Sequence, residues 1–127
     1  MSNPRFFLCE HCGNLAGMLH DSGVPMLCCG QPMTELIPGS RDAAKEKHVP
    51  SVQVQGDTVR VSVGSAPHPM VEEHFIEWVY LHTAHGGQRK ALTPGQKPET
   101  VFSLCGGDRP LAVYAYCNLH GLWKTDL

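Results

Sequence analysis

Tyr116-Cys117-Asn118-Leu119-His120-Gly121, near the end of the 127-residue chain, is the stretch from which the fold and the site can be worked out. Cys117 ends an alternating apolar run that predicts a β-strand, and His120 follows in a turn favoured by Asn118 and Gly121. A thiolate and an imidazole at this spacing can bind one metal ion together. Two ligands do not complete a site, so the others must come from elsewhere in the chain.

Between Pro50 and this stretch, short apolar runs alternate with turn residues, a pattern typical of an antiparallel β-protein. The expected strands cover residues 52–54, 59–63, 75–82, 89–92, 101–104 and 111–117. Turns are expected at Gly56-Asp57, Gly86-Gly87, Pro94-Gly95 and Gly106-Gly107-Asp108. The expected core stripe is Val52, Val54, Val59, Val61 and Val63. This spacing predicts a mainly β chain with an immunoglobulin-like antiparallel β-sandwich. The charge-rich segment from Arg41 to Lys47 is expected to form one or two helical turns, which Pro50 ends.

The first 37 residues contain too few large apolar side chains to fold by burial alone, so this segment needs a cross-link such as a metal site or disulfides. Cys9 and Cys12 form a knuckle with Gly13, and Cys28 and Cys29 are adjacent. Four thiolates in this order predict a metal site, but their spacing does not choose between zinc and iron. Two disulfides are the alternative, which the missing secretion signal disfavours. Pro38-Gly39-Ser40 is the expected linker, giving domains at 1–37 and 38–127.

The charge balance restricts the classes of partner. The formal net charge is -2, so no basic surface is expected for nucleic acid or anionic lipid. No apolar run is long enough to span a bilayer, and the N-terminus has no apolar signal segment. We therefore expect a soluble, cytoplasmic protein with no nucleic-acid or membrane partner. Any anionic substrate must be attracted by local charge.

A second metal site is predicted in the C-terminal part. His48, His68 and His74 lie in polar or proline-containing stretches, where they can converge with Cys117 and His120. Each histidine alone is more often an ordinary surface residue, so the prediction depends on the whole set. Five ligands are one too many for tetrahedral zinc, whereas four imidazoles and one thiolate suit iron or copper. With the imidazoles in a plane and Cys117 axial, the position opposite the sulfur stays open.

Formal charge separates the two sites. Fe(II) with four thiolates is a net anion, whereas Fe(II) with four neutral imidazoles and one thiolate is a net cation. The first centre repels an anion and is coordinatively closed, so it can only pass electrons. Chemistry on a small anion is therefore expected at the second centre.

Glu46 and Lys47, which directly precede His48, are the predicted catalytic residues. A solvated charged pair at a helix end is the simpler alternative for such a dipeptide. Beside a metal ligand, however, Lys47 can attract an anion and assist proton delivery. Glu46 can occupy the open coordination position in the oxidised state.

The remaining histidines and the sixth cysteine are not expected to bind metal. His11 and His20 are treated as non-ligands, and His82 and His85 as mainly surface residues beside a turn. Cys105 is expected to be a plain, partly buried thiol.

Taken together, these motifs resemble desulfoferrodoxin, the two-iron superoxide reductase family, over almost the whole chain. The matching elements are Cys9-Glu10-His11-Cys12-Gly13-Asn14, Cys28-Cys29, Glu46-Lys47-His48-Val49-Pro50, His68-Pro69-Met70, His74 and Cys117-Asn118-Leu119-His120-Gly121. The resemblance implies a desulforedoxin-like Fe(Cys)4 domain followed by a sandwich domain with an Fe(His)4(Cys) centre, hence two non-haem iron ions per chain. It also implies one-electron reduction of superoxide to hydrogen peroxide without oxygen production, a rubredoxin-like electron donor and a homodimer. The choice of iron for the first site comes from this resemblance alone.

Two other functions remain possible from the residues themselves. One is a non-catalytic rubredoxin-like electron-transfer protein, in which only the thiolate centre works. The other is a zinc-ribbon interaction module fused to a β-sandwich. Both leave the five-residue set around Cys117 unexplained. Metal analysis separates the three, because they require two irons, one iron and no iron per chain.

Overall fold

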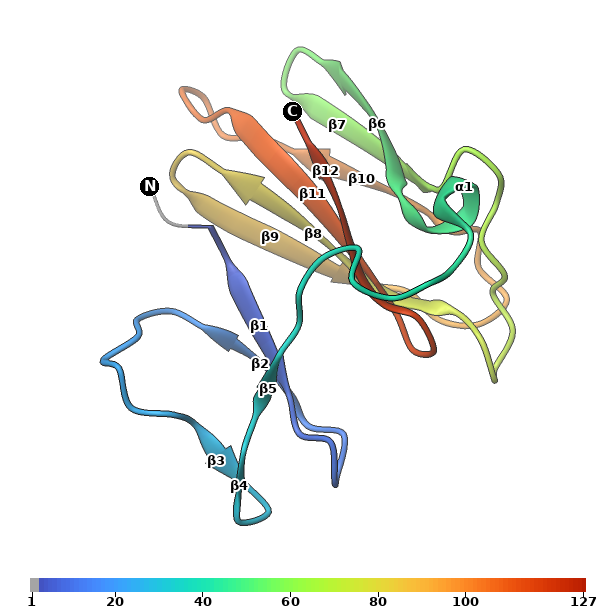
Figure 1. The fold of residues 1–127 in the computed structure, drawn as a ribbon. Helices are drawn as coiled ribbons and strands as arrows, with labels where there is room; N and C mark the ends of the chain where they lie inside the picture. Colours follow the sequence, from blue (N-terminus) through green and yellow to red (C-terminus); the bar gives the residue numbers. More distant parts are fainter. Residues whose placement is uncertain (1–2) are drawn as a thin grey trace. The chain divides into compact units, whose positions relative to one another are not determined.

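The computed structural model describes residues 3–127, and the chain divides into two compact units, Met1–Ile37 and Pro38–Leu127 (Figure 1). Both units consist mainly of antiparallel β-strands, which confirms the predicted fold class. Within the described residues, no helix has the length and apolar character needed to cross a membrane.

The first unit contains a small sheet and a hairpin. β1 (Arg5–Leu8) lies between β2 (Leu15–Met18) and β5 (Thr34–Glu35), and β3 (Leu27–Cys28) pairs with β4 (Gln31–Pro32). Phe6 and Phe7 on β1 are buried, and the Arg5 guanidinium donates to Glu35 at 2.9 Å and to Asp21 at 2.7 Å. The sequence does not predict these strands, because they are too short to display an alternating pattern.

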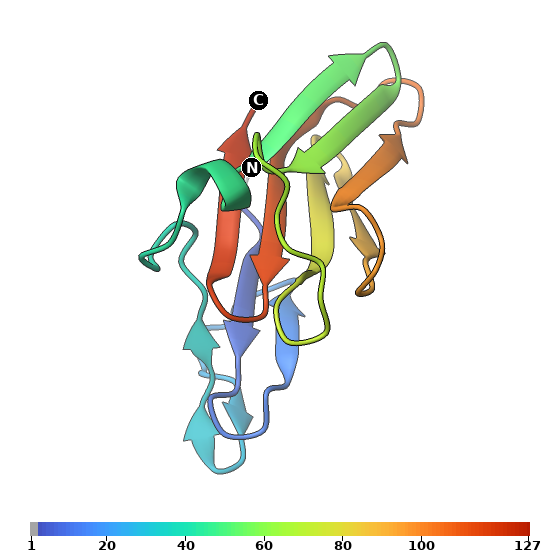
Figure 2. The same cartoon turned by 90° about the vertical axis from the view of Figure 1, so that its right-hand side faces the viewer.

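The second unit is an antiparallel β-sandwich. Its strands are β6 (Pro50–Gln55), β7 (Thr58–Val63), β8 (Ile76–Thr83), β9 (Gly86–Ala91), β10 (Glu99–Ser103), β11 (Pro110–Cys117) and β12 (Gly121–Asp126). One sheet has the order β10-β7-β6 and the other the order β12-β11-β8-β9. The loop between β7 and β8 runs beside the turn between β11 and β12 (Figure 2).

The core of this unit comes from the inner faces of both sheets. The buried apolar cluster combines Val59, Val61, Val63 and Phe102 of one sheet with Ile76, Val79, Leu81, Val113, Ala115 and Cys117 of the other. Three valines of the predicted stripe are therefore core, whereas Val52 is only partly buried and Val54 is 48% exposed. The expectation was wrong for Val54 because it lies near the end of β6, an edge strand.

Three local expectations differ from the structure. The β8–β9 hairpin turns at Ala84 and His85, so Gly86 and Gly87 belong to β9 instead. The only helical segment in the described part of the chain is α1 (Lys45–His48), which is one turn, as expected, but begins at Lys45 instead of Arg41. β12 was not predicted, although it pairs with β11 from Gly121 to Asp126. Because β11 ends at Cys117 and β12 begins at Gly121, the two paired strands fix the turn between them from both sides.

Candidate metal centres

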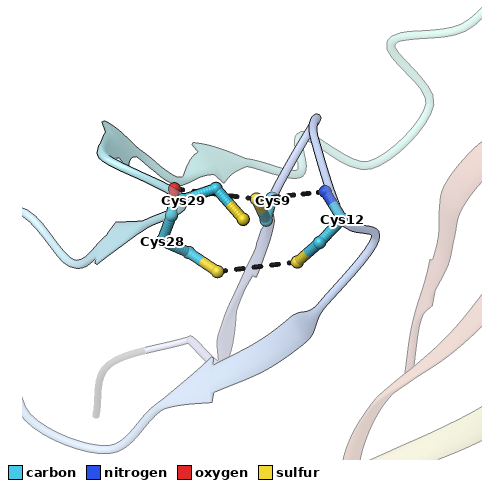
Figure 3. A group of neighbouring side chains, drawn as sticks. All are labelled: Cys9, Cys12, Cys28 and Cys29. Carbon is cyan, nitrogen blue, oxygen red and sulfur yellow. Dashed lines mark hydrogen bonds between the residues drawn. The ribbon is translucent and has the colours of Figure 1, made fainter.

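The four cysteines of the first unit point toward one common centre (Figure 3). Cys9 and Cys12 follow β1, Cys28 ends β3 and Cys29 comes directly after it. Their sulfur atoms all lie within 4.8 Å of one another, and the Cys12 and Cys28 sulfurs are 3.6 Å apart. Tetrahedral ligation at a metal–sulfur distance of about 2.3 Å places sulfurs roughly 3.8 Å apart. All four cysteines are free thiols, so the alternative pair of disulfides is not formed.

Backbone amides around this group favour thiolates. The Cys12 N–H points at the Cys9 sulfur at 3.5 Å, and the Asn14 N–H points at the Cys12 sulfur at 3.4 Å. The Cys12 amide is the main reason that the pKa of Cys9 falls to about 6. The neighbouring Cys12 thiol has the opposite effect on Cys29, whose pKa rises to about 12. Four thiolates can therefore coexist here only with a cation between them, and a metal ion fits this site.

The second cluster collects residues from three segments of the sandwich unit. His48 ends α1, His68 and His74 lie in the loop between β7 and β8, and Cys117 and His120 flank the β11–β12 turn. Ligand atoms of His48, His74, Cys117 and His120 all lie within 4.8 Å of one another. His68 is outside this group of four, but its Nε2 is 3.2 Å from Nε2 of His48. The structure thus brings together all five residues that the sequence suggested.

The four imidazoles form a ring around one point. Centroids of successive rings are 4.6 Å apart for His48–His68, 4.7 Å for His68–His74, 5.0 Å for His74–His120 and 5.0 Å for His120–His48. The distance across the ring, from His48 to His74, is longer, at 6.3 Å. Nearly equal sides with a longer diagonal describe a square arrangement. This arrangement fits an equatorial set of four imidazoles.

Hydrogen bonds to backbone carbonyls fix which nitrogen atoms face inward. His48 donates from Nδ1 to the Ala44 carbonyl, and His68 donates from Nδ1 to the Pro69 carbonyl, each at 2.7 Å. Because a carbonyl only accepts, the Nε2 atoms of both neutral rings carry lone pairs, and these lone pairs face each other across 3.2 Å. Two facing lone pairs repel unless a cation lies between them. Carbonyl partners of this kind commonly orient metal-binding histidines.

Burial favours the neutral form of three ring histidines and leaves one of their nitrogens without a partner. Desolvation lowers the pKa of His68 to about 4 and also lowers the pKa values of His48 and His74. Nε2 of His74 is the one buried side-chain nitrogen or oxygen that lacks a hydrogen-bond partner in the described chain. A buried atom without a partner calls for an explanation, and a bound metal ion supplies one.

Cys117 completes the set from the interior. Its side chain is fully buried, and its sulfur is 3.8 Å from Nδ1 of His120. Burial raises the pKa of the Cys117 thiol, while the backbone N–H groups of Leu119 and His120 oppose the rise. The thiolate therefore needs a nearby cation to form. Four imidazoles and one thiolate exceed the tetrahedral set of zinc and fit iron or copper.

Glu46 and Lys47 lie beside the ring on α1, and both are exposed. After burial and the charges of His120 and His48, the charge of Lys47 also lowers the pKa of His74. Lys47 therefore acts electrostatically across the ring and not only on its neighbour His48. The backbone carbonyl of Glu46 accepts the Ala66 N–H at 2.8 Å, which ties α1 to the loop that carries His68.

The sequence did not point to two residues that support the ring. Trp123 on β12 packs against His48, with ring centroids 5.0 Å apart, and its Nε1 donates to the His120 carbonyl at 3.0 Å. Gly64 lies so close to α1 that an added Cβ would meet the Glu46 carbonyl oxygen at 2.6 Å. In the sequence, the close approach of Gly64 to α1 is indicated only by a glycine that directly follows a valine-rich strand.

The residues set aside from the sequence lie outside both clusters. His82 was expected at the surface, but it is buried on β8, which lies between β11 and β9 in the sheet. His85 is exposed, with its Nδ1 3.4 Å from the Asp108 carboxylate. Cys105 was expected to be partly buried but is exposed, because it lies in the loop after β10.

Comparison with known proteins agrees with this pair of clusters. A family model described as desulfoferrodoxin matches residues 40–126. A desulfoferrodoxin from Syntrophotalea carbinolica is 48% identical over 120 residues, covering 94% of each chain. One from Nitratidesulfovibrio vulgaris is 43% identical over 122 residues, covering 96% of this chain and 95% of the relative. The crystal structure of a superoxide reductase from Treponema pallidum has a TM-score of 0.84 and 41% identity, covering 98% of this chain and 100% of that one. The chain therefore belongs to the desulfoferrodoxin family.

Proposed function

We propose that the chain is a superoxide reductase, which uses one electron and two protons to convert superoxide to hydrogen peroxide without releasing oxygen. The observation that carries this proposal is the square of four imidazoles around one point, with the buried Cys117 beside it. A related chain of the same architecture is described as a superoxide reductase, which supports the assignment.

The chain holds two non-haem iron ions, one in each unit. His48, His68, His74, Cys117 and His120 would hold the iron of the sandwich domain, residues 38–127. Cys9, Cys12, Cys28 and Cys29 would hold the other iron in the desulforedoxin-like domain, residues 1–37. When bound, the sandwich iron supplies the single electron and a positively charged centre for the anion.

The ring side chains keep this centre cationic. Burial favours the neutral form of His48 and His68, and their bonds to the Ala44 and Pro69 carbonyls place the hydrogen on Nδ1. They therefore present lone pairs without adding negative charge. Cys117 contributes the single negative charge, which the Leu119 and His120 N–H groups favour. The set as a whole attracts an anion, whereas four thiolates repel one.

Lys47 provides the local positive charge that a chain of net charge -2 needs in order to attract superoxide. Its side chain is exposed, and its charge acts on both His48 and His74. The ammonium group steers the anion toward the ring and organises a proton for the peroxide product. Glu46 closes the open side of the site in the oxidised state, when no substrate is present.

The four-cysteine centre accepts electrons from an external donor. Two of its cysteines, Cys12 and Cys29, are exposed, so a small protein can approach them directly. We assign this role to a rubredoxin-like donor, and we expect the enzyme to act as a cytoplasmic homodimer.

Two matched variants test the proposal in a single turnover. The chain is loaded with iron, reduced chemically and mixed with superoxide. Cys117→Ala should abolish superoxide consumption, whereas Cys29→Ala should lose only the first iron and still consume superoxide. If Cys29→Ala is inactive and Cys117→Ala is active, the reaction occurs at the four-cysteine centre and the proposal is wrong.

A further inference from the structure

Asn118 connects the turn that carries Cys117 and His120 to the loop that carries His74. Its side-chain Nδ2 donates to the Glu73 carbonyl at 2.9 Å, and its Oδ1 accepts the Phe75 N–H at 3.0 Å. Its backbone N–H donates to the Phe75 carbonyl at 3.2 Å. One residue thus binds the chain on both sides of His74.

These bonds lie where the regular sheet ends. The pairing of β8 with β11 shifts register between Tyr116 and Cys117 and stops at the Cys117–Ile76 pair. The Asn118 side-chain amide uses one N–H group as a donor and its oxygen as an acceptor, as a peptide group does, and so continues the pairing beyond the last strand residue. The loop is also closed at its other end, because Val71 and His74 exchange two backbone hydrogen bonds of 3.1 and 3.0 Å.

His74 depends on this support more than its neighbours do. Ring hydrogen bonds to carbonyls orient His48 and His68. Nε2 of His74, in contrast, is a buried atom with no hydrogen-bond partner. The position of this side chain follows from the backbone of Glu73 and Phe75, which Asn118 holds in place.

We infer that Asn118 is a positioning residue of the sandwich metal site, because it fixes His74 against Cys117 and His120. The inference rests on the proposed function, since the ion to be held is the iron of that site. Loss of an outer partner of this kind typically reduces metal affinity about 10- to 100-fold. Asn118→Leu removes both side-chain hydrogen bonds at similar volume. Asn118→Asp keeps an acceptor for Phe75 but places an oxygen against the Glu73 carbonyl.

The test uses the full chain loaded with 57Fe and exposed to an iron(II) chelator at rising concentration. Mössbauer spectra separate iron bound by four thiolates from iron bound mainly by nitrogen. We expect the affinity of the nitrogen-bound iron to fall about 10- to 100-fold in Asn118→Leu and by less in Asn118→Asp. The thiolate-bound iron should be unchanged in both variants and serves as the internal reference.

Gln88→Leu is the matched control. The Gln88 amide donates to the Ser103 carbonyl at 2.8 Å and lies opposite Leu81, far along β8 from Ile76. This variant should retain both irons as the wild type does. Urea unfolding of the metal-free variants shows whether general destabilisation explains a loss of iron.

Three results would overturn the inference. Asn118→Leu could retain nitrogen-bound iron with wild-type affinity and spectrum. It could also lose that iron only in proportion to a lower stability of the metal-free chain. In either case the proposed function stands and Asn118 is not a positioning residue. A wild-type chain without any nitrogen-bound iron would instead overturn the proposed function, and the inference with it.

Discussion

The Nε2 atoms of His48 and His68 lie 3.2 Å apart, while both rings donate their Nδ1 hydrogen to a backbone carbonyl. No hydrogen atom of either neutral ring is left to lie between the two lone pairs. In the metal-free fold the two Nε2 lone pairs therefore repel each other. A bound cation removes this repulsion, because both nitrogens then coordinate it. This relationship makes metal binding and the stability of the sandwich interdependent.

Removal of iron should destabilise the sandwich unit. At free iron about 1,000-fold above the dissociation constant, binding contributes roughly 4 kcal/mol to the free energy of unfolding. Trp78 and Trp123 are the two tryptophans of the chain, and both lie in this unit, so tryptophan fluorescence reports its unfolding alone. Urea titrations with and without a chelator should give clearly separated midpoints. Coincident midpoints would mean that the ring does not bind the metal.

The metal-free chain should also lose stability as the pH falls. Burial lowers the pKa of His68 from 6.5 to about 4, so the unfolded chain takes up a proton that the folded chain refuses. The contribution of His68 to the free energy of unfolding is therefore fully present above pH 6.5 and is lost as the pH falls toward 4. For His68 the loss amounts to as much as about 3 kcal/mol.

Urea unfolding at a series of pH values measures this loss. His68→Gln cannot titrate, so its free energy of unfolding should fall less over the same range. An equal fall in the variant would show that His68 does not contribute to the pH dependence.

Lys47 should control the encounter with superoxide. Lys47→Ile is expected to slow the second-order reaction of the reduced enzyme about tenfold and to flatten its dependence on ionic strength. Lys45→Ile is the matched control, because Lys45 is also exposed on α1 but lies two residues further from His48. Pulse radiolysis at several salt concentrations gives both quantities. An unchanged rate in Lys47→Ile would remove Lys47 as a steering group.

Glu46 should affect the oxidised enzyme and not the encounter. Glu46→Ala is expected to shift the visible absorption of the oxidised sandwich centre, because the open side then loses its carboxylate. The rate with superoxide should remain within about twofold, because the encounter uses the reduced enzyme, whereas Glu46 is expected to approach the site only in the oxidised state. Glu72→Ala provides the control, as an exposed carboxylate in the loop between His68 and His74. If the oxidised spectrum of Glu46→Ala equals that of the wild type, Glu46 does not close the site.

Features carried by local sequence patterns were predictable. The alternation of Val59, Val61 and Val63 indicates a strand with one buried face, and the structure places all three in the core. The cysteine spacing and the Cys117–His120 pair indicate metal ligands, because thiolates and imidazoles at short spacing have few other uses. The family resemblance then supplied the identity of the metal.

Features that depend on distant contacts were not predictable. The carbonyls of Ala44 and Pro69 select the inward nitrogen of each ring, and a backbone oxygen leaves no mark in the sequence. β12 was missed because its burial depends on pairing with β11 along its whole length. His82 was misassigned for a similar reason, since only the assembled sheet covers its side chain.

Iron held by the four imidazoles and Cys117 is expected to reduce superoxide instead of dismuting it. The most direct test is to supply the iron-loaded enzyme and an electron donor with a steady flux of superoxide while recording peroxide and oxygen together. Reduction predicts one hydrogen peroxide for each superoxide consumed and no oxygen from superoxide. Formation of one oxygen for every peroxide would indicate dismutation, and that result would contradict the account.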